Sequence, residues 1–67
     1  MKVMLRHSTT GKLIVYVAKK DLEEEVLEQN QVGEDWILTL SNGWELSVAG
    51  LENPIQTPQT VEARRLN

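Results

Sequence analysis

The densest group of acid–base side chains in this sequence is a run of three carboxylates beside two lysines. Glu23, Glu24 and Glu25 follow Lys19 and Lys20 closely, and a pair of carboxylates can act as general acid and general base. Consecutive carboxylates point in different directions, however, and no histidine or nucleophile stands near them in the sequence. The run also lacks the spaced Asp/Asn pattern of a calcium loop. We therefore interpret it as a solvated charged segment.

The histidine and hydroxyl side chains near the start of the sequence form no catalytic pattern. His7 precedes Ser8, Thr9 and Thr10, but a nucleophile–histidine–acid triad requires a spatial arrangement that one short segment does not supply. With no cysteine and one histidine, the chain lacks the ligands for a thiolate zinc site or an iron–sulfur cluster. We expect no catalytic residues, no metal site and no cofactor, and we predict that the protein is not an enzyme.

Two tryptophans, Trp36 and Trp44, have the rings needed to stack nucleic-acid bases. Both alternate with leucine and valine in the sequence, so we interpret them as core anchors. Partial exposure of one ring at a partner interface remains an alternative, because tryptophan is enriched at binding hot spots. The formal net charge of −3 disfavours nucleic acid as a partner.

Charge is distributed unevenly along the sequence. Residues 1–20 carry five basic and no acidic side chains, whereas residues 21–53 carry nine acidic and no basic ones. A molecule with two charged regions of opposite sign is suited to docking on a complementary protein surface. Ordinary charge balance within the molecule is the favoured explanation of the pattern, and docking on a partner is the alternative.

Short apolar runs separated by polar turns predict strands. The first two are Lys2–His7 and Leu13–Ala18, paired through the turn between them, and the second run is β-branched and aromatic.

Residues 19–29 allow two interpretations. Asp21, Glu24 and the spacing of Leu22, Val26 and Leu27 fit a capped helix, but an isolated helix of about eight residues is marginal. We favour a turn at Lys20-Asp21 and a short strand over residues 25–29.

Trp36–Ala49 predicts a hairpin whose register follows from its apolar pattern. A two-residue Asn-Gly turn would scatter the apolar side chains over both faces of the hairpin. A three-residue loop, Ser41-Asn42-Gly43, with the glycine in the left-handed conformation, places six of them on one face and leaves Ile37 on the other with polar side chains. It pairs Leu40 with Trp44, Leu38 with Leu46 and Trp36 with Val48. If both tryptophans are buried, replacing Trp44 by alanine should cost about 3–5 kcal/mol of stability.

The rest of the sequence completes the prediction of the fold. Residues 50–59 contain two prolines and predict a connecting loop, and residues 60–66 predict a last strand with Val61 and Ala63 directed inward. We expect one all-β domain over residues 1–67: a small, partly closed, barrel-like sheet of five or six short antiparallel strands. The N-terminal segment is too short and interrupted for a signal peptide, and no apolar run could span a bilayer. Because the sequence shows neither a signal peptide nor a membrane-spanning run, we expect a cytoplasmic protein.

Four blocks span most of the sequence: Met1-Lys2-Val3-Met4, Tyr16–Glu24, Leu38–Leu46 and Thr60–Leu66. In these blocks and in their order, the sequence resembles the NifT/FixU family of small proteins encoded among nitrogen-fixation genes. It implies a compact barrel-like β fold and a role associated with nitrogen fixation. For this family, help in nitrogenase maturation or in assembly of its metal cofactor is commonly suggested, and no catalytic residues are assigned.

The absence of cysteine limits the roles in nitrogen fixation that the resemblance implies. A chain without cysteine is poorly equipped to carry an iron–sulfur or iron–molybdenum cluster itself, so we expect an accessory protein that docks on nitrogenase or its assembly machinery. The predicted contact residues are Lys19, Lys20, Asp21, Arg64 and Arg65. The alternative is a nucleic-acid-binding or regulatory module, because small barrels often bind oligonucleotides.

Overall fold

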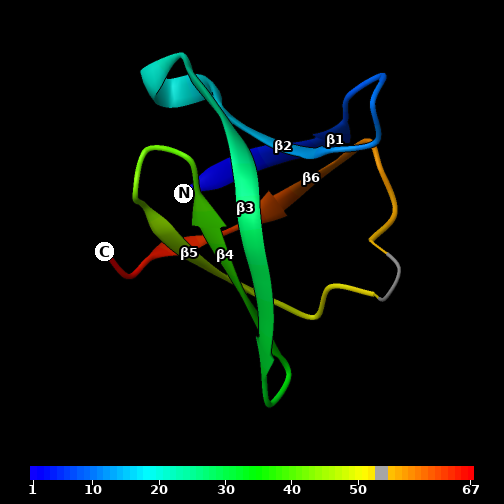
Figure 1. Cartoon of the computed structure of the whole chain (residues 1–67). Coiled ribbons are helices and arrows are strands. Elements are labelled where there is room, and N and C mark those ends of the chain that lie inside the picture. The colour runs from blue at the N-terminus through cyan, green and yellow to red at the C-terminus, as the bar shows by residue number, and fades with distance from the viewer. Residues whose placement is uncertain (53–54) are drawn as a thin grey trace.

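The apolar runs of the sequence form seven β-strands in the computed structural model, which describes residues 1–52 and 55–67. A 3-10 turn, η1, covers Ala18–Lys20. The strands are β1 (Lys2–His7), β2 (Leu13–Val17), β3 (Leu22–Val32), β4 (Asp35–Leu40), β5 (Glu45–Ala49), β6 (Gln59–Glu62) and β7 (Arg64–Arg65). Figure 1 shows their course along the chain. No helix that could span a membrane occurs among the described residues.

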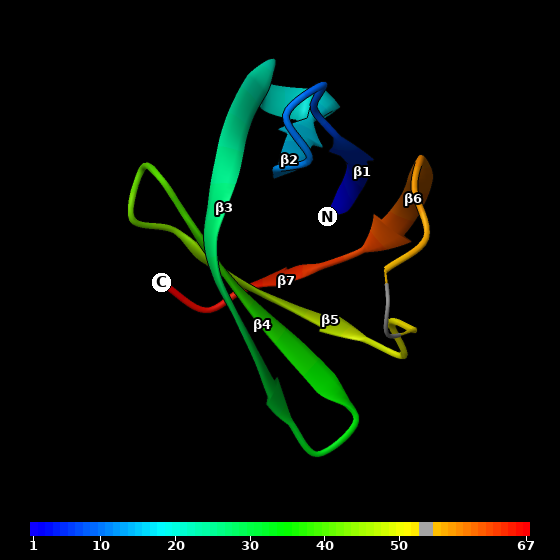
Figure 2. The same cartoon turned by 45° about the vertical axis from the view of Figure 1, so that its right-hand side comes forward.

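All strand pairs are antiparallel, and the sheet curls until its two edges nearly meet. The strand order is β6-β1-β2-β3-β4-β5-β7, so the edge strands β6 and β7 are neighbours in the chain, with only Ala63 between them. One segment thus runs along both edges, pairing first with β1 and then with β5, as Figure 2 shows. The all-β, barrel-like prediction is confirmed. The described part of the chain has seven strands rather than the predicted five or six, and one reason is that the predicted last strand is divided at Ala63 into β6 and β7.

The predicted hairpin register is confirmed. Leu38 pairs with Leu46 and Trp36 with Val48. The three-residue loop is closed by hydrogen bonds from the Leu40 amide to the Trp44 carbonyl (2.8 Å) and from the Gly43 amide to the Leu40 carbonyl (2.9 Å). Gly43 has φ +94°, a conformation that a residue with a Cβ adopts only under strain.

The helical alternative for residues 19–29 is wrong. The predicted turn followed by a strand is confirmed, although the strand is longer than predicted. Asp21 ends η1 in the left-handed conformation, with φ 48°. β3 then begins at Leu22, earlier than expected, and continues to Val32. Strand pairing decides the conformation, because β3 has β2 as a neighbour over its first part and β4 over its second. Leu27, part of the near-helical pattern, is 58% exposed and lies where the β3–β4 register shifts.

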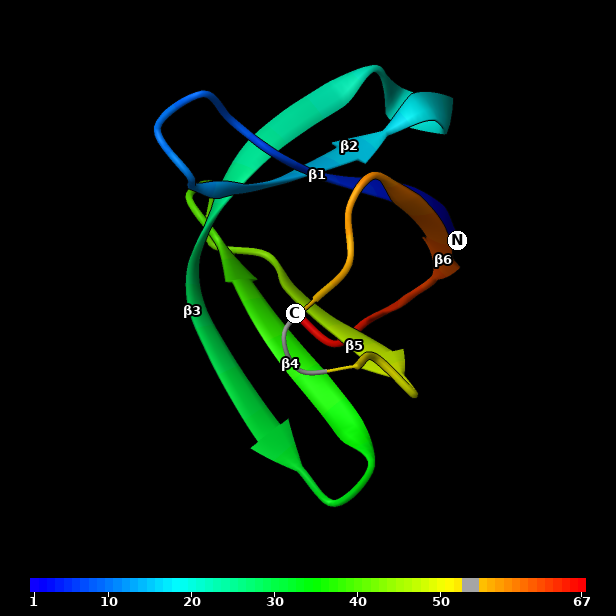
Figure 3. The same cartoon turned by 90° about the vertical axis from the view of Figure 1, so that its right-hand side faces the viewer.

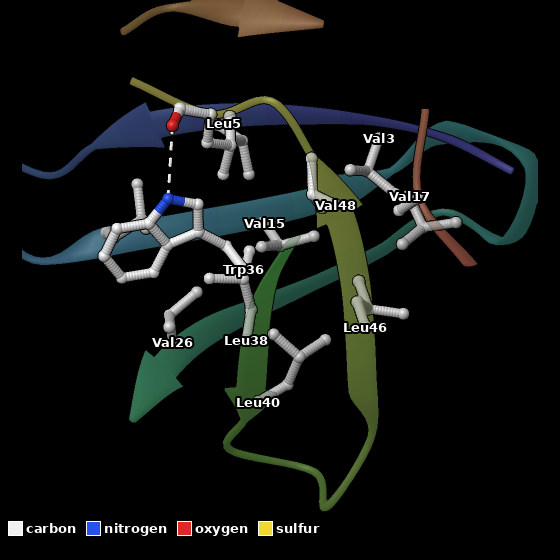
Figure 4. Packing of buried hydrophobic residues seen from close by; sticks show 13 residues of the cluster. Val3, Leu5, Val15, Val17, Val26, Trp36, Leu38, Leu40, Leu46 and Val48 are labelled. Carbon is white, nitrogen blue, oxygen red and sulfur yellow. Dashed lines mark hydrogen bonds between the residues drawn. The ribbon is translucent and has the colours of Figure 1, made fainter. Parts of the chain in front are cut away.

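The core fills the inside of the curled sheet. Its side chains come mainly from alternate positions of β1, β2, β4 and β5, and ten of the thirteen are labelled in Figure 4. Trp36 lies at one end and donates a hydrogen bond from Nε1 to the Leu51 carbonyl (3.2 Å). Ala63 is buried and Val61 packs against the core, as predicted for the last strand.

The connection between β5 and β6 forms no strand in its described part, as predicted. Residues 53 and 54 of that predicted loop lie outside the described residues. Leu51 is buried, and Ile55 packs against the core. The connection therefore covers one end of the barrel next to Trp36.

Candidate functional site

Three segments distant in the sequence meet around the ring of Trp44. Lys20 of η1 places Nζ 5.4 Å from the ring centroid, and Arg65 of β7 places Cζ 3.9 Å from it. Trp44 itself is half-buried and packs against the core cluster. Both cations lie within the range of a cation–π interaction. We call Lys20, Trp44 and Arg65 together the Trp44 surface.

Backbone hydrogen bonds hold β7 beside Trp44. The Leu66 amide donates to the Glu45 carbonyl (2.7 Å), and the Glu45 amide donates to the Asn67 carbonyl (2.9 Å). The residue after Trp44 is therefore tied to both residues that follow Arg65. The Arg65 side chain is positioned by the sheet ladder rather than by a flexible tail.

The other cation is positioned by the turn between β2 and β3. The Asp21 amide donates to the Ala18 carbonyl (3.2 Å) and closes the turn. The Tyr16 hydroxyl donates to Asp21 Oδ1 (3.0 Å). This hydrogen bond and the negative charge of Asp21 raise the pKa of the Tyr16 phenol above its usual value, because both favour the neutral phenol. Asp21 therefore has a structural part in holding the turn that carries Lys20.

The basic side chains divide into paired and unpaired ones. Arg6 contacts Glu23 (2.8 Å) and Lys12 contacts Glu25 (3.5 Å), so part of the charge pattern is balanced within the molecule. None of the ion pairs between described residues involves the four predicted basic contact residues, all of them exposed: Lys19, Lys20, Arg64 and Arg65. Their positive charges remain available to a partner.

The structure brings together some of the predicted contact residues and separates others. Lys19, Lys20 and Asp21 lie on or next to η1, and Lys20 meets Arg65 at Trp44. Arg64, on the opposite face of β7, lines a hollow with Asp35 and Glu62. The interpretation of both tryptophans as core anchors holds fully for Trp36, which is buried. Trp44 packs against the core but is only partly buried, which matches the alternative of one partly exposed ring. Its place at the end of the apolar stripe, next to the loop, was the signal for its exposure.

Glu24 and the histidine each contact a hydroxyl group within the molecule. Glu24 accepts a hydrogen bond from the Ser41 hydroxyl (2.8 Å), which links β3 to the β4–β5 loop. His7 Nδ1 lies 2.6 Å from the Thr57 hydroxyl. No group of three or more metal-ligating side chains occurs among the described residues.

The fold and the Trp44 surface define the class of protein: a small antiparallel sheet nearly closed into a barrel, with a partly exposed tryptophan beside two cations that have no carboxylate partner among the described residues. The chain belongs to the NifT/FixU family, because the sequence model of that family, described as NifT/FixU protein, matches residues 1–63. The family is associated with nitrogen fixation.

Individual relatives cover nearly the whole chain. It is 39% identical to a FixU homolog of Sinorhizobium fredii, over 98% of this chain and 87% of the relative. It is 40% identical to protein FixU of Rhizobium leguminosarum bv. trifolii, over 97% of this chain and 93% of the relative. A segment of protein MosB of Rhizobium meliloti is 41% identical over 98% of this chain, but it is only 13% of that protein. The same sequence pattern thus also occurs as part of a much longer polypeptide.

Proposed function

We propose that this protein is a non-enzymatic, cytoplasmic accessory protein of nitrogen fixation that docks on nitrogenase or on its assembly machinery. In this role it assists maturation of the enzyme or assembly of its metal cofactor by binding a protein rather than by carrying the cofactor. Family membership supports the process, and a sequence without cysteine favours docking over cluster transport.

The observation that carries the proposal is the meeting of Lys20 and Arg65 over the partly exposed Trp44 ring. Tryptophan and arginine are the residue types most enriched at binding hot spots. The two cations have no carboxylate partner among the described residues. The surface therefore fits a partner that presents carboxylates around an apolar contact.

Charge reversal tests this assignment. The wild-type protein is used as bait in extracts of nitrogen-fixing cells, in parallel with Lys20→Glu and Arg65→Glu variants. We expect each variant to recover nitrogenase or assembly proteins about tenfold less well than wild type, because reversal places like charges opposite each other. Binding by the wild type should weaken as salt is added.

Lys2→Glu is the matched control, because Lys2 is exposed on β1 and undergoes the same charge change outside the Trp44 surface. It should bind like wild type. If wild type recovers no nitrogenase or assembly component at low salt, the proposal fails. Salt-dependent binding of single-stranded nucleic acid that is lost in a Lys19→Glu, Lys20→Glu double variant would support the regulatory alternative instead.

A further inference from the structure

The second half of β3 has a strand neighbour on one side only. β2 pairs with β3 over Leu22–Glu25, whereas β4 continues along β3 to Val32. In Figures 1 and 3 the β3–β4 hairpin extends beyond β2 at the end of the molecule away from η1. All residues from 27 to 32 are exposed. This part of β3 is an open sheet edge.

The turn geometry identifies the backbone groups that face the open side. Val32 pairs with Asp35, so only two residues form the turn, and in such hairpins the flanking pair exchanges both of its hydrogen bonds. Hydrogen-bonded and non-hydrogen-bonded pairs then alternate along the ladder. Gln31 and Gln29, the non-hydrogen-bonded positions, therefore direct their amides and carbonyls away from β4.

The usual protection of an edge strand is missing here. Natural edges carry lysines, prolines or inward charges that block further pairing. Residues 28–32, Glu-Gln-Asn-Gln-Val, contain no lysine or proline and a single charge. The register shift of the β3–β4 ladder lies before them, between Val26 and Glu28. This leaves a regular five-residue edge with Asn30 at its centre.

We propose that this edge pairs with the same edge of a second copy of the chain, in an antiparallel, two-fold symmetric dimer centred on Asn30. A two-fold axis perpendicular to the sheet pairs residues on the same face. Gln29 of each copy then lies opposite Gln31 of the other, and these pairs form about four backbone hydrogen bonds.

The side chains at this register are self-complementary. Glu28 lies opposite Val32, so no two carboxylates face each other across the ladder. The amide side chains of Gln29, Asn30 and Gln31 contain both donors and acceptors and can hydrogen-bond to their own kind. The Trp44 surface lies near η1, at the other end of β3, so a dimer would present two copies of it.

Sedimentation equilibrium and amide hydrogen exchange test the dimer directly. The proposal expects a monomer–dimer equilibrium across a range of protein concentration. It also expects the Gln29 and Gln31 amides to become protected as the dimer forms, because only pairing covers them. A monomer at all concentrations, or a dimer in which these two amides still exchange freely, would overturn the proposal. Either result would leave the edge open to a strand of another protein.

Asn30→Lys is the informative variant. It places two ammonium groups opposite each other across the two-fold axis and should weaken dimerisation at least tenfold. The monomer should fold normally, because Asn30 is exposed. Thr60→Lys makes the same charge change at an exposed position of β6 and should dimerise like wild type. Equal effects of the two variants would show that net charge, not the β3 edge, controls association.

Discussion

At the scale of single residues, the two tryptophans have different parts in the molecule. Trp36 is 9% exposed, and its indole nitrogen donates a hydrogen bond to the Leu51 carbonyl. Trp44 has core contacts on one side and two cations at its ring. Both side chains belong to one apolar face of the hairpin, but only Trp36 is buried within the core.

This difference predicts unequal costs of truncation. Trp36→Ala should lower the free energy of unfolding by about 3–5 kcal/mol, as for a buried aromatic that leaves a cavity. Trp44→Ala should cost about 1–2 kcal/mol, because half-burial and exposed cation–π contacts contribute less. Urea unfolding of both variants measures the difference. Equal costs would mean that Trp44 is as much a core residue as Trp36.

At the scale of elements, the β4–β5 hairpin depends on the backbone conformation of one loop residue. Gly43 has φ +94°, and nothing lies within 4 Å of the place where its Cβ would be. A substitution there meets no steric obstacle from neighbouring groups. Its cost comes from the left-handed conformation alone.

Gly43→Ala should therefore destabilise the protein by about 1–2 kcal/mol. Gly43→Asn should cost clearly less, because asparagine adopts the left-handed region more readily. Thermal or urea unfolding of the pair separates a conformational cost from a packing cost. If alanine and asparagine cost the same, the loop does not depend on the left-handed conformation.

At the scale of the whole molecule, the barrel closes where β6 becomes β7. Ala63 is buried there. The Met1 nitrogen donates to the Ala63 carbonyl and the Ala63 amide donates to the Met1 carbonyl, both at 2.7 Å. The segment leaves β1 and joins β5 at this point. A small side chain lets the segment pass close to the core, and Figure 2 shows the course of the chain from β6 to β7.

Ala63→Leu should cost about 1–3 kcal/mol, because extra methylene groups in a packed interior force side chains or backbone to shift. Thr60→Leu is the control, since Thr60 is exposed on the same segment and should change stability little. Chemical denaturation compares the two. A neutral Ala63→Leu variant would mean that the closure is loosely packed.

The sequence by itself determined what depends on local, period-two patterning. The all-β class, the first two strands and the register of the β4–β5 hairpin follow from alternation and from one loop. A one-residue slip would move every apolar side chain of the hairpin to the other face. The pattern of a single segment is therefore enough to select the register.

Only the tertiary structure decided the features that depend on neighbours distant in the chain. Residues 19–29 contain both a helical and a strand pattern, and pairing with β2 and β4 made them a strand. The sequence predicts one continuous last strand, but in the structure this segment pairs with β1 before Ala63 and with β5 after it. Lys20, Trp44 and Arg65 meet because closure of the barrel brings η1 and β7 to the same ring. No local pattern specifies such a meeting, because it arises from how the whole sheet curls.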